Sequence, residues 1–129
     1  MNDRELLELA ARAAGMQVNE QRQAERDAVV DPATASLWIV GGCTAWNPLT
    51  DDGDALRLAV KRGLVVTPDR ENQRTLVSNQ AGHEYCAIYW DKLGEMAATR
   101  LAITEAAAEI GKSMEVGNER REEANRMAR

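Results

Sequence analysis

Three aspartates, Asp51, Asp52 and Asp54, place three carboxylates within four residues and are the first candidates for metal binding. A calcium loop of the EF-hand type spreads its ligands over about twelve residues and closes with a glutamate, whereas this run leads directly into a helical pattern. Carboxylates stabilise the positive end of a helix dipole, and Thr50 can accept hydrogen bonds from the free N–H groups there. We therefore predict a helix start and no metal site. A single magnesium or calcium ion is the alternative, because a cation reduces repulsion between the carboxylates.

The chain has one histidine, His83, and two cysteines, Cys43 and Cys86. A zinc site would have to combine all three with a carboxylate, and their spacing is not that of a zinc knuckle. A nucleophilic Cys86–His83 pair is not expected, because side chains an odd number of residues apart on a strand point to opposite faces. Each cysteine is predicted to be a buried thiol, and His83 a solvated loop residue. The serines also lack a nucleophile-elbow pattern; they are Ser36, Ser78 and Ser113. The sequence therefore predicts no catalytic residue, no cofactor and no enzyme activity.

The segment Trp46-Asn47-Pro48 precedes the aspartates and is the second candidate site. A tryptophan in a loop preceded by glycines either packs beneath the domain or projects as a binding anchor, and we favour packing. Asn47 is expected to shape the turn through its side chain, and Pro48 to fix the approach to the helix. If the segment binds a ligand or partner, the residues expected to do so are Trp46, Asn47, Asp51, Asp52 and Asp54.

Two helices that could position these residues are predicted from the spacing of apolar side chains. The first covers residues 3–14, with Asn2 or Asp3 as its cap. The second covers residues 51–62 and ends at Gly63, which can adopt the left-handed conformation. The buried stripe of this second helix is predicted to consist of Ala55, Leu56, Ala59 and Val60.

A third and longest helix is predicted over residues 93–110, with Gly111 as its stop. Leu101 falls opposite its apolar stripe, so it is either simply exposed or part of a contact with another molecule. Residues 113–129 are charged and almost without apolar periodicity, which predicts a frayed helix or a disordered tail. The stripe that should face the core is Met96, Ala97, Ile103, Ala106, Ala107 and Ile110.

Short runs of β-branched and aromatic residues predict the strands. The turn-forming segment 79–82 separates two of them and indicates an antiparallel hairpin. The polar segment 19–36 lacks periodicity and contains Asp31-Pro32, so a long loop is predicted there. The expected strands cover residues 37–40, 64–66, 75–77 and 85–90, with a short edge strand at 16–18.

Taken together, these elements predict an α+β domain over residues 1–112, followed by the charged tail. A small antiparallel sheet of three to four strands is expected to pack with about three helices, of which the C-terminal one is long. A chain of 129 residues suits a single core.

Charge and cysteine content restrict the partners and the compartment. A formal net charge of −5 would repel a phosphate backbone, so direct nucleic-acid binding is not expected. Two cysteines do not form a secreted disulfide framework, and no apolar run has the length of a signal-peptide core or a membrane span. We expect a cytoplasmic protein that does not enter membranes.

The run from Trp46 to Val60, the aromatic strand and the segment from Ala97 to Ala107 resemble small tailed-phage and prophage proteins of proteobacteria, similar to the phage ABA-sandwich domain group. The resemblance extends from the first helix to about Lys112. It implies helices packed on a small antiparallel sheet, in an accessory protein that works in the cytoplasm of the host bacterium. It implies no catalytic residues.

Three functional hypotheses follow. The first is a non-enzymatic phage or prophage protein that binds a host protein, for example an inhibitor of a defence system such as CRISPR interference, with an acidic surface that mimics nucleic acid. The second is a small-molecule or nucleotide-binding protein that sequesters its ligand by stacking on a tryptophan. The third is an assembly factor that self-associates as a homo-oligomer through the long helix. The stacking candidates are Trp38, Trp46 and Trp90.

Overall fold

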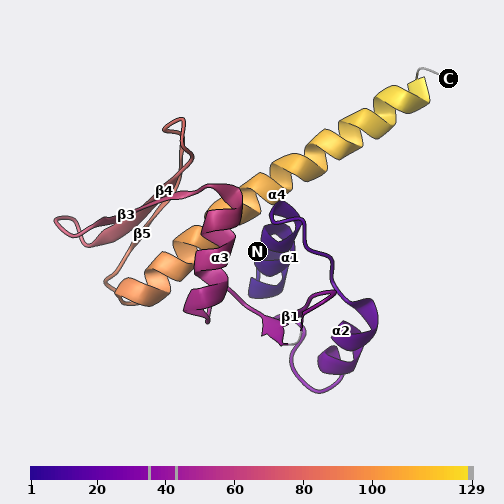
Figure 1. The fold of residues 1–129 in the computed structure, drawn as a ribbon, viewed down its shortest axis with the longest axis horizontal. Coiled ribbons are helices and arrows are strands. Elements are labelled where there is room, and N and C mark those ends of the chain that lie inside the picture. The colour runs from indigo at the N-terminus through magenta and orange to yellow at the C-terminus, as the bar shows by residue number, and fades with distance from the viewer. Residues whose placement is uncertain (35, 43, 128–129) are drawn as a thin grey trace.

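The computed structural model describes residues 1–34, 36–42 and 44–127. Within them the chain forms an α+β fold, which confirms the predicted class. Figure 1 shows the long helix α4 running diagonally through the molecule, with the other elements arranged along it. The helices are α1 (Asp3–Ala13), α2 (Glu20–Asp27), α3 (Asp52–Arg62) and α4 (Glu95–Met127). The strands are β1 (Leu37–Trp38), β2 (Ala45–Trp46), β3 (Val65–Asp69), β4 (Arg74–Ser78) and β5 (Glu84–Tyr89).

The strands form two antiparallel sheets, where one was expected. In the larger sheet β4 lies between β3 and β5, and the predicted hairpin is the β4–β5 pair. Strand β3 continues through Pro68 to Asp69, beyond the predicted strand end at residue 66. Pro68 is tolerated because β3 is an edge strand, where its missing N–H costs no ladder hydrogen bond. The smaller sheet pairs β1 with β2, and Val18 forms a single bridge to Ile39 beside it.

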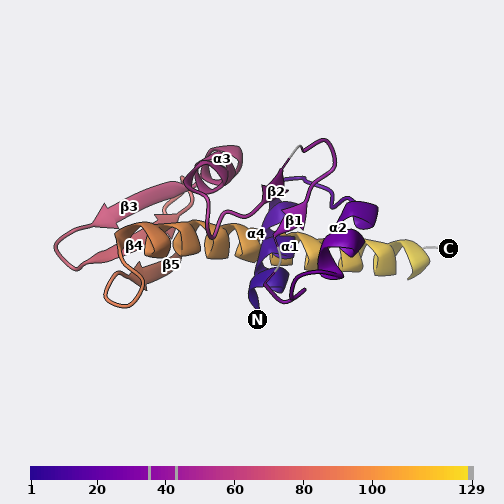
Figure 2. The ribbon, with the colours of Figure 1, turned by 90° about the horizontal axis from the view of Figure 1, so that it is seen from below.

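Helices α1 and α3 and the three-stranded sheet pack on helix α4, whereas β1 of the smaller sheet contacts α1 and α2 (Figure 2). Helix α1 crosses α4 on one side, and α3 and the three-stranded sheet contact the first half of α4. The buried side chains along this helix are mostly small, so the neighbouring backbones approach closely. The central core comprises Leu7, Leu37, Trp46, Leu58, Val77 and Ile103, surrounded by buried alanines of α1, α3 and α4.

The prediction that the long helix stops at Gly111 was wrong, because α4 continues to Met127. Gly111 lies inside the helix and is buried where α1 crosses it. A Cβ at this position would overlap the backbone carbonyl of Leu9, so glycine permits the crossing. Met96 was also wrongly placed in the core, since it is 57% exposed in the first turn of α4.

Helices α1 and α3 form where they were predicted, and their caps explain their limits. Asn2 accepts a hydrogen bond from the N–H of Glu5 at 2.9 Å and caps α1. Gly63 ends α3 in the left-handed conformation, with φ of +61°. The cap of α3 is Asp51, however, and the prediction of Thr50 was wrong by one residue. The Thr50 hydroxyl turns back to the carbonyl of Asn47.

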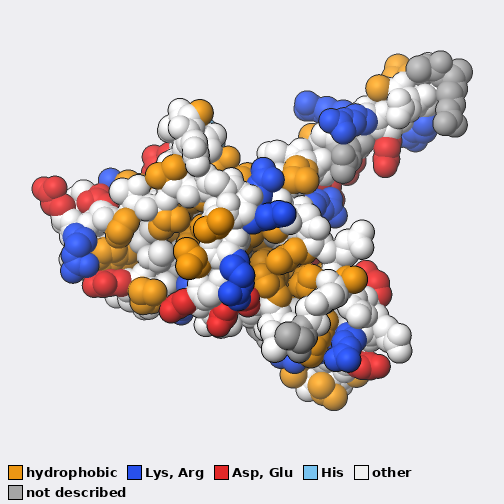
Figure 3. Space-filling model, viewed as in Figure 1, with side chains coloured by type: hydrophobic (Ala, Val, Ile, Leu, Met, Phe, Trp, Pro, Cys, Tyr) orange, Lys and Arg blue, Asp and Glu red, His pale blue; other side chains and the backbone are white. Residues whose placement is uncertain are grey.

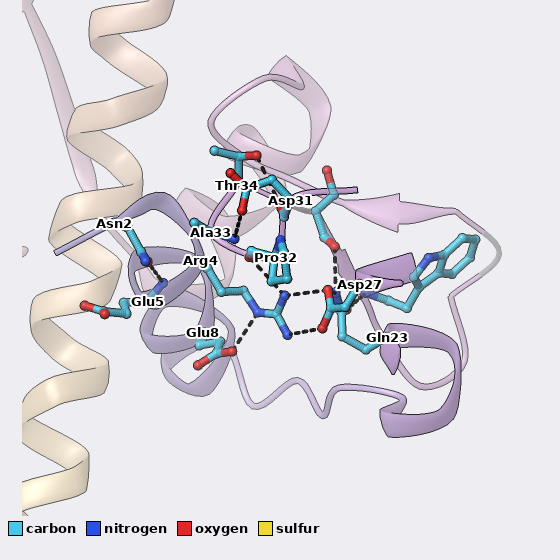
Figure 4. Close-up of polar contacts among 12 residues, drawn as sticks. Asn2, Arg4, Glu5, Glu8, Gln23, Asp27, Asp31, Pro32, Ala33 and Thr34 are labelled. Atoms are coloured by element: carbon cyan, nitrogen blue, oxygen red, sulfur yellow. Dashed lines mark hydrogen bonds and ion pairs between the residues drawn. The ribbon is translucent and has the colours of Figure 1, made fainter. Parts of the chain in front are cut away.

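The segment 19–36, predicted to be a long loop, contains helix α2. Only Gln23 of this helix is buried, so α2 has no apolar stripe that a sequence could display. Its contacts are polar (Figure 4): Gln23 donates to Asp27 and to the carbonyl of Ser36, and accepts the N–H of Trp38 at 2.7 Å. Arg4 of α1 binds both carboxylate oxygens of Asp27, at 2.9 and 3.2 Å. Hydrogen bonds across the chain therefore hold α2 in place.

None of the described helices combines the length and the apolar character that a membrane crossing requires. The prediction of a buried thiol at Cys43 lies outside the described residues.

Candidate functional site

Trp46, the first predicted site residue, lies in the core and is 7% exposed. It ends β2, where it pairs with Leu37 of β1, and Pro48 after it is also fully buried. The favoured interpretation of Trp46 as a packing residue agrees with this position. In this conformation its ring offers no surface to a partner.

Asn47 organises the turn between β2 and α3. Its side-chain carbonyl accepts the N–H of Leu49 at 3.0 Å, and its amide nitrogen donates to the hydroxyl of Ser36 at 3.0 Å. Its backbone N–H donates to Asp54 across the turn, also at 3.0 Å. Each polar group of Asn47 named here is therefore used inside the protein, as expected for a turn-shaping residue.

The three aspartates are brought to one helix end, and each has a partner within the protein. Asp51 accepts the N–H of Asp54 at 2.7 Å and caps α3. Asp54 forms an ion pair with Arg57 one turn on, at 2.8 Å. Asp52 reaches away from the other two and pairs with Arg100 of α4 at 2.6 Å. Backbone donors and guanidinium groups supply the compensating positive charge.

A cation at this helix end was the alternative interpretation of the aspartates. The part of the chain that the structure describes contains no group of three or more His, Cys, Asp or Glu side chains placed to hold a metal ion. Arg100 also donates through Nε to the carbonyl of Leu49 at 2.9 Å, so it clamps the start of α3 to α4. The predicted segment therefore orients α3 on the body of the protein.

The tryptophans differ in how far they could stack on a ligand. Trp90 is 5% exposed, and its indole N–H donates to Thr75 inside the protein. Trp38 is partly exposed, but the guanidinium of Arg22 already lies over its ring, 5.2 Å from the centroid. With Trp46 buried as well, two of the three rings are buried, and the third carries Arg22 over one face.

His83 and Cys86, the other candidates, lie on the β4–β5 hairpin. His83 is exposed in the loop, as predicted, and its ring meets Tyr85 edge to face with centroids 5.0 Å apart. Cys86 is partly buried, and its thiol donates to the carbonyl of Ala102 at 3.2 Å. Burial raises the pKa of this thiol to about 12, with smaller contributions from the carboxylates of Glu105 and Glu84. A thiol with so high a pKa is a poor nucleophile at neutral pH.

The outer face of α3 is a feature that the sequence reasoning missed. Leu56 and Val60 were predicted to be buried, but they are 65% and 73% exposed and lie one turn apart. Ala55 and Ala59 of the predicted stripe are buried, as expected, and Leu58 completes the side of the helix that faces the core. Figure 3 shows hydrophobic side chains over α3, with basic and acidic side chains beside them. Leu58 is the residue that could have indicated this exposure, because it gives the helix a second apolar side besides the one with Leu56 and Val60.

A groove lies between α4 and the β4–β5 hairpin. This groove, of about 900 Å³, is lined on one side by Arg62, His83, Glu84 and Tyr85. Its other side is formed by α4 from Glu109 to Arg121. In Figure 3 it is the open hollow between the protruding hairpin loop and the projecting end of α4. It contains both basic and acidic side chains and brings together residues far apart in the sequence.

Comparisons of this chain with models of protein families, with curated proteins and with solved structures gave no match.

Proposed function

We propose that this protein is a non-enzymatic binding protein that uses the outer face of α3, defined by Leu56 and Val60, to bind another protein. The single observation that carries this proposal is the exposure of these two large aliphatic side chains on a helix fixed at both ends. Exposed apolar side chains that lie together on a rigid element are typical of protein-binding surfaces. Burying them in an interface would remove their apolar area from water.

The rigidity of α3 favours this function. Asp51 and Gly63 define the ends of the helix, and the Asp52–Arg100 ion pair ties its first turn to α4. A surface that is already ordered loses little conformational entropy on binding. The residues from Trp46 to Asp54 then serve the function indirectly, because they hold the binding helix in position.

The charges around this face indicate the chemistry of the partner. Lys61 follows Val60 along α3 and is exposed, whereas the exposed Arg57 is already paired with Asp54. A partner that offers an apolar segment with a carboxylate beside it would complement Val60 and Lys61. The acidic groups at the start of α3 are already paired with Arg57 and Arg100, which favours an apolar contact over mimicry of nucleic acid.

The resemblance to phage proteins indicates the setting. We propose a phage or prophage accessory protein that acts in the cytoplasm of its host bacterium on a host protein. Inhibition of a defence system, such as CRISPR interference, is the most concrete version, because an inhibitor that blocks a surface needs no catalytic group.

The test is capture of the partner from host cells by the tagged protein, followed by mass spectrometry. The double variant Leu56→Gln, Val60→Gln should lose a partner that the wild-type protein retains. The matched control is Val29→Gln, Val40→Gln, since these valines are also exposed, at 81% and 57%, but lie elsewhere. Retention of the partner by the α3 variant, with its fold verified by circular dichroism, would reject the proposal.

Salt dependence separates the apolar contact from nucleic-acid mimicry. Binding dominated by Leu56 and Val60 should weaken only modestly when salt is added, because apolar burial is not screened and only the contact to Lys61 is. An acidic surface that occupies a basic channel should instead lose affinity steeply. A steep loss would place the contact on the carboxylates rather than on α3.

A further inference from the structure

Helix α4 projects beyond the body of the protein. Residues 112–127, here called the arm, extend the helix by about 24 Å at the usual rise per residue. Figure 1 shows the arm extending beyond the other helices and strands. Most of its described side chains are exposed, and its one recorded ion pair to the body joins Glu115 to Arg12 at 3.6 Å.

A helix of this length is marginal in water without a packing partner. The i,i+4 charge pairs give it little net support, because Glu115 and Glu119 repel each other, as do Glu119 and Glu123, while Glu122 and Arg126 attract. Gly117 weakens the arm further, since glycine in a helix costs about 1 kcal/mol relative to alanine. The described contacts within one copy therefore leave the arm short of tertiary support.

One face of the arm continues the buried stripe of α4 out into solvent. Its residues are spaced alternately by four and three, which is the spacing of a helix-packing seam. Met114 on this face is 40% exposed, and a Cβ added at Gly117 would meet no atom within 4 Å. The seam runs from the core outward as Ile103, Ala107, Ile110, Met114, Gly117, Arg121 and Ala124.

The same face forms one wall of the groove, which is open. Ile110, Met114, Gly117 and Arg121 lie on the α4 side, while the body side presents Arg62, His83 and Glu84. An occupant therefore has to offer small apolar side chains toward the arm and charged side chains of both signs toward the body, with a carboxylate for Arg62 and a cation for Glu84. The arm itself has this composition, because its seam is small and apolar apart from Arg121, and its other sides carry Glu119, Glu122 and Glu123 together with Arg120 and Arg126.

We propose that the groove is occupied by the arm of a second copy of this chain, running antiparallel, so that two copies exchange arms in a symmetric dimer. The seams pack against each other, and the carboxylates of each incoming arm lie toward Arg62 of the other copy. Such an interface is self-complementary, because every copy supplies one arm and one groove. It uses surfaces other than the outer face of α3.

The experiment is sedimentation of the full chain over a wide range of protein concentrations. The wild-type protein should be a dimer that dissociates on dilution. Met114→Glu should shift the midpoint of dissociation by at least tenfold toward higher concentration, because it places a charge in the seam. Val116→Glu is the matched control, since Val116 is 41% exposed but lies off the seam, and it should stay close to wild type.

Two further variants test the seam and the groove separately. Gly117→Leu improves helix propensity in a single copy but blocks close approach of two arms, so it should also weaken the dimer. Arg62→Glu should weaken it, and Glu122→Arg with Glu123→Arg in the same chain should restore it. A wild-type protein that sediments as a monomer throughout, or equal effects of Met114→Glu and Val116→Glu, would overturn the proposal. If the variant Leu56→Gln, Val60→Gln retained its partner in the capture experiment, the proposed function would be rejected but the dimer proposal would not.

Discussion

The hydroxyl oxygens of Thr75 and Thr99 lie 2.7 Å apart and join the middle strand of the sheet to α4. Thr75 also accepts the indole N–H of Trp90 at 2.9 Å, and Thr99 donates to the carbonyl of Glu95 at 2.7 Å. Because the one hydroxyl proton of Thr99 goes to Glu95, the hydroxyl of Thr75 is the donor between the two threonines. The four residues form a directed chain of hydrogen bonds that fastens the sheet to the helix.

Replacing Thr75 by valine should break this chain while nearly preserving side-chain volume. The buried indole N–H of Trp90 would lose its acceptor, so we expect the free energy of unfolding to fall by about 1–3 kcal/mol. Urea denaturation measures the change. Thr67→Val is the control, because Thr67 is exposed on β3 and its replacement should change stability by less than about 0.5 kcal/mol. Equal losses in the two variants would contradict the prediction.

Gly111→Ala should destabilise the fold through the α1–α4 crossing. The new methyl group would overlap the carbonyl of Leu9, and moving either backbone should cost at least about 2 kcal/mol. Gly117→Ala adds the same methyl group to the same helix in open space and should raise stability by up to about 1 kcal/mol. Thermal unfolding at one low protein concentration compares the two. The prediction fails if both alanines act in the same direction.

Asp27 should make stability depend on pH in the acidic range. The Arg4 guanidinium, and after it the Gln23 amide, hold the pKa of Asp27 below its ordinary value. A lowered pKa stabilises the folded state above the unfolded-state pKa of about 4, and this contribution is lost as the pH falls through the folded-state pKa. Asp27→Asn should therefore be less stable than wild type at neutral pH.

The difference between Asp27→Asn and wild type should shrink as the pH falls below about 4. Urea midpoints measured across this range provide the test. Glu25→Gln is the control, because Glu25 is exposed on the same helix α2 and makes no recorded ion pair among the described residues. A difference that stayed constant down to the lowest pH would show that the Arg4–Asp27 pair does not act through its charge.

The thiol of Cys86 should react slowly in the folded protein. Its pKa of about 12 leaves little thiolate at neutral pH, and its hydrogen bond to Ala102 holds the side chain inward. In a Cys43→Ser background, alkylation followed by mass spectrometry should be far slower without denaturant than with it. The same comparison in Cys86→Ser shows how Cys43 contributes. Rapid alkylation of folded Cys86 would contradict the raised pKa.

Elements that depend on neighbouring residues could be predicted well. Asn2 and Gly63 mark helix ends because a side-chain acceptor and a left-handed glycine act within a few residues of chain. The hairpin between β4 and β5 is signalled by its own loop, 79–82. The shift of the α3 cap from Thr50 to Asp51 is the typical error, since both residues carry a suitable oxygen.

Elements that depend on distant residues were missed. Helix α2 is polar throughout, and Gln23 and Asp27 find their partners on α1 and β1. For the candidate site, the sequence correctly indicated that Asn47 shapes the turn, but the exposed pair Leu56 and Val60 was predicted to be buried. An apolar residue on each side of a helix does not reveal which side the core will cover.

The sequence by itself determined the α+β class, most of the helix ends and the role of the Trp46–Asp54 segment as a helix start, because capping, turns and periodicity are local. Only the tertiary structure decided that Gly111 is a crossing point rather than a helix stop. It also decided which face of α3 is exposed and that Thr75 joins the sheet to α4. Those outcomes depend on which backbone segments and side chains approach one another across the fold, and tertiary packing determines those approaches.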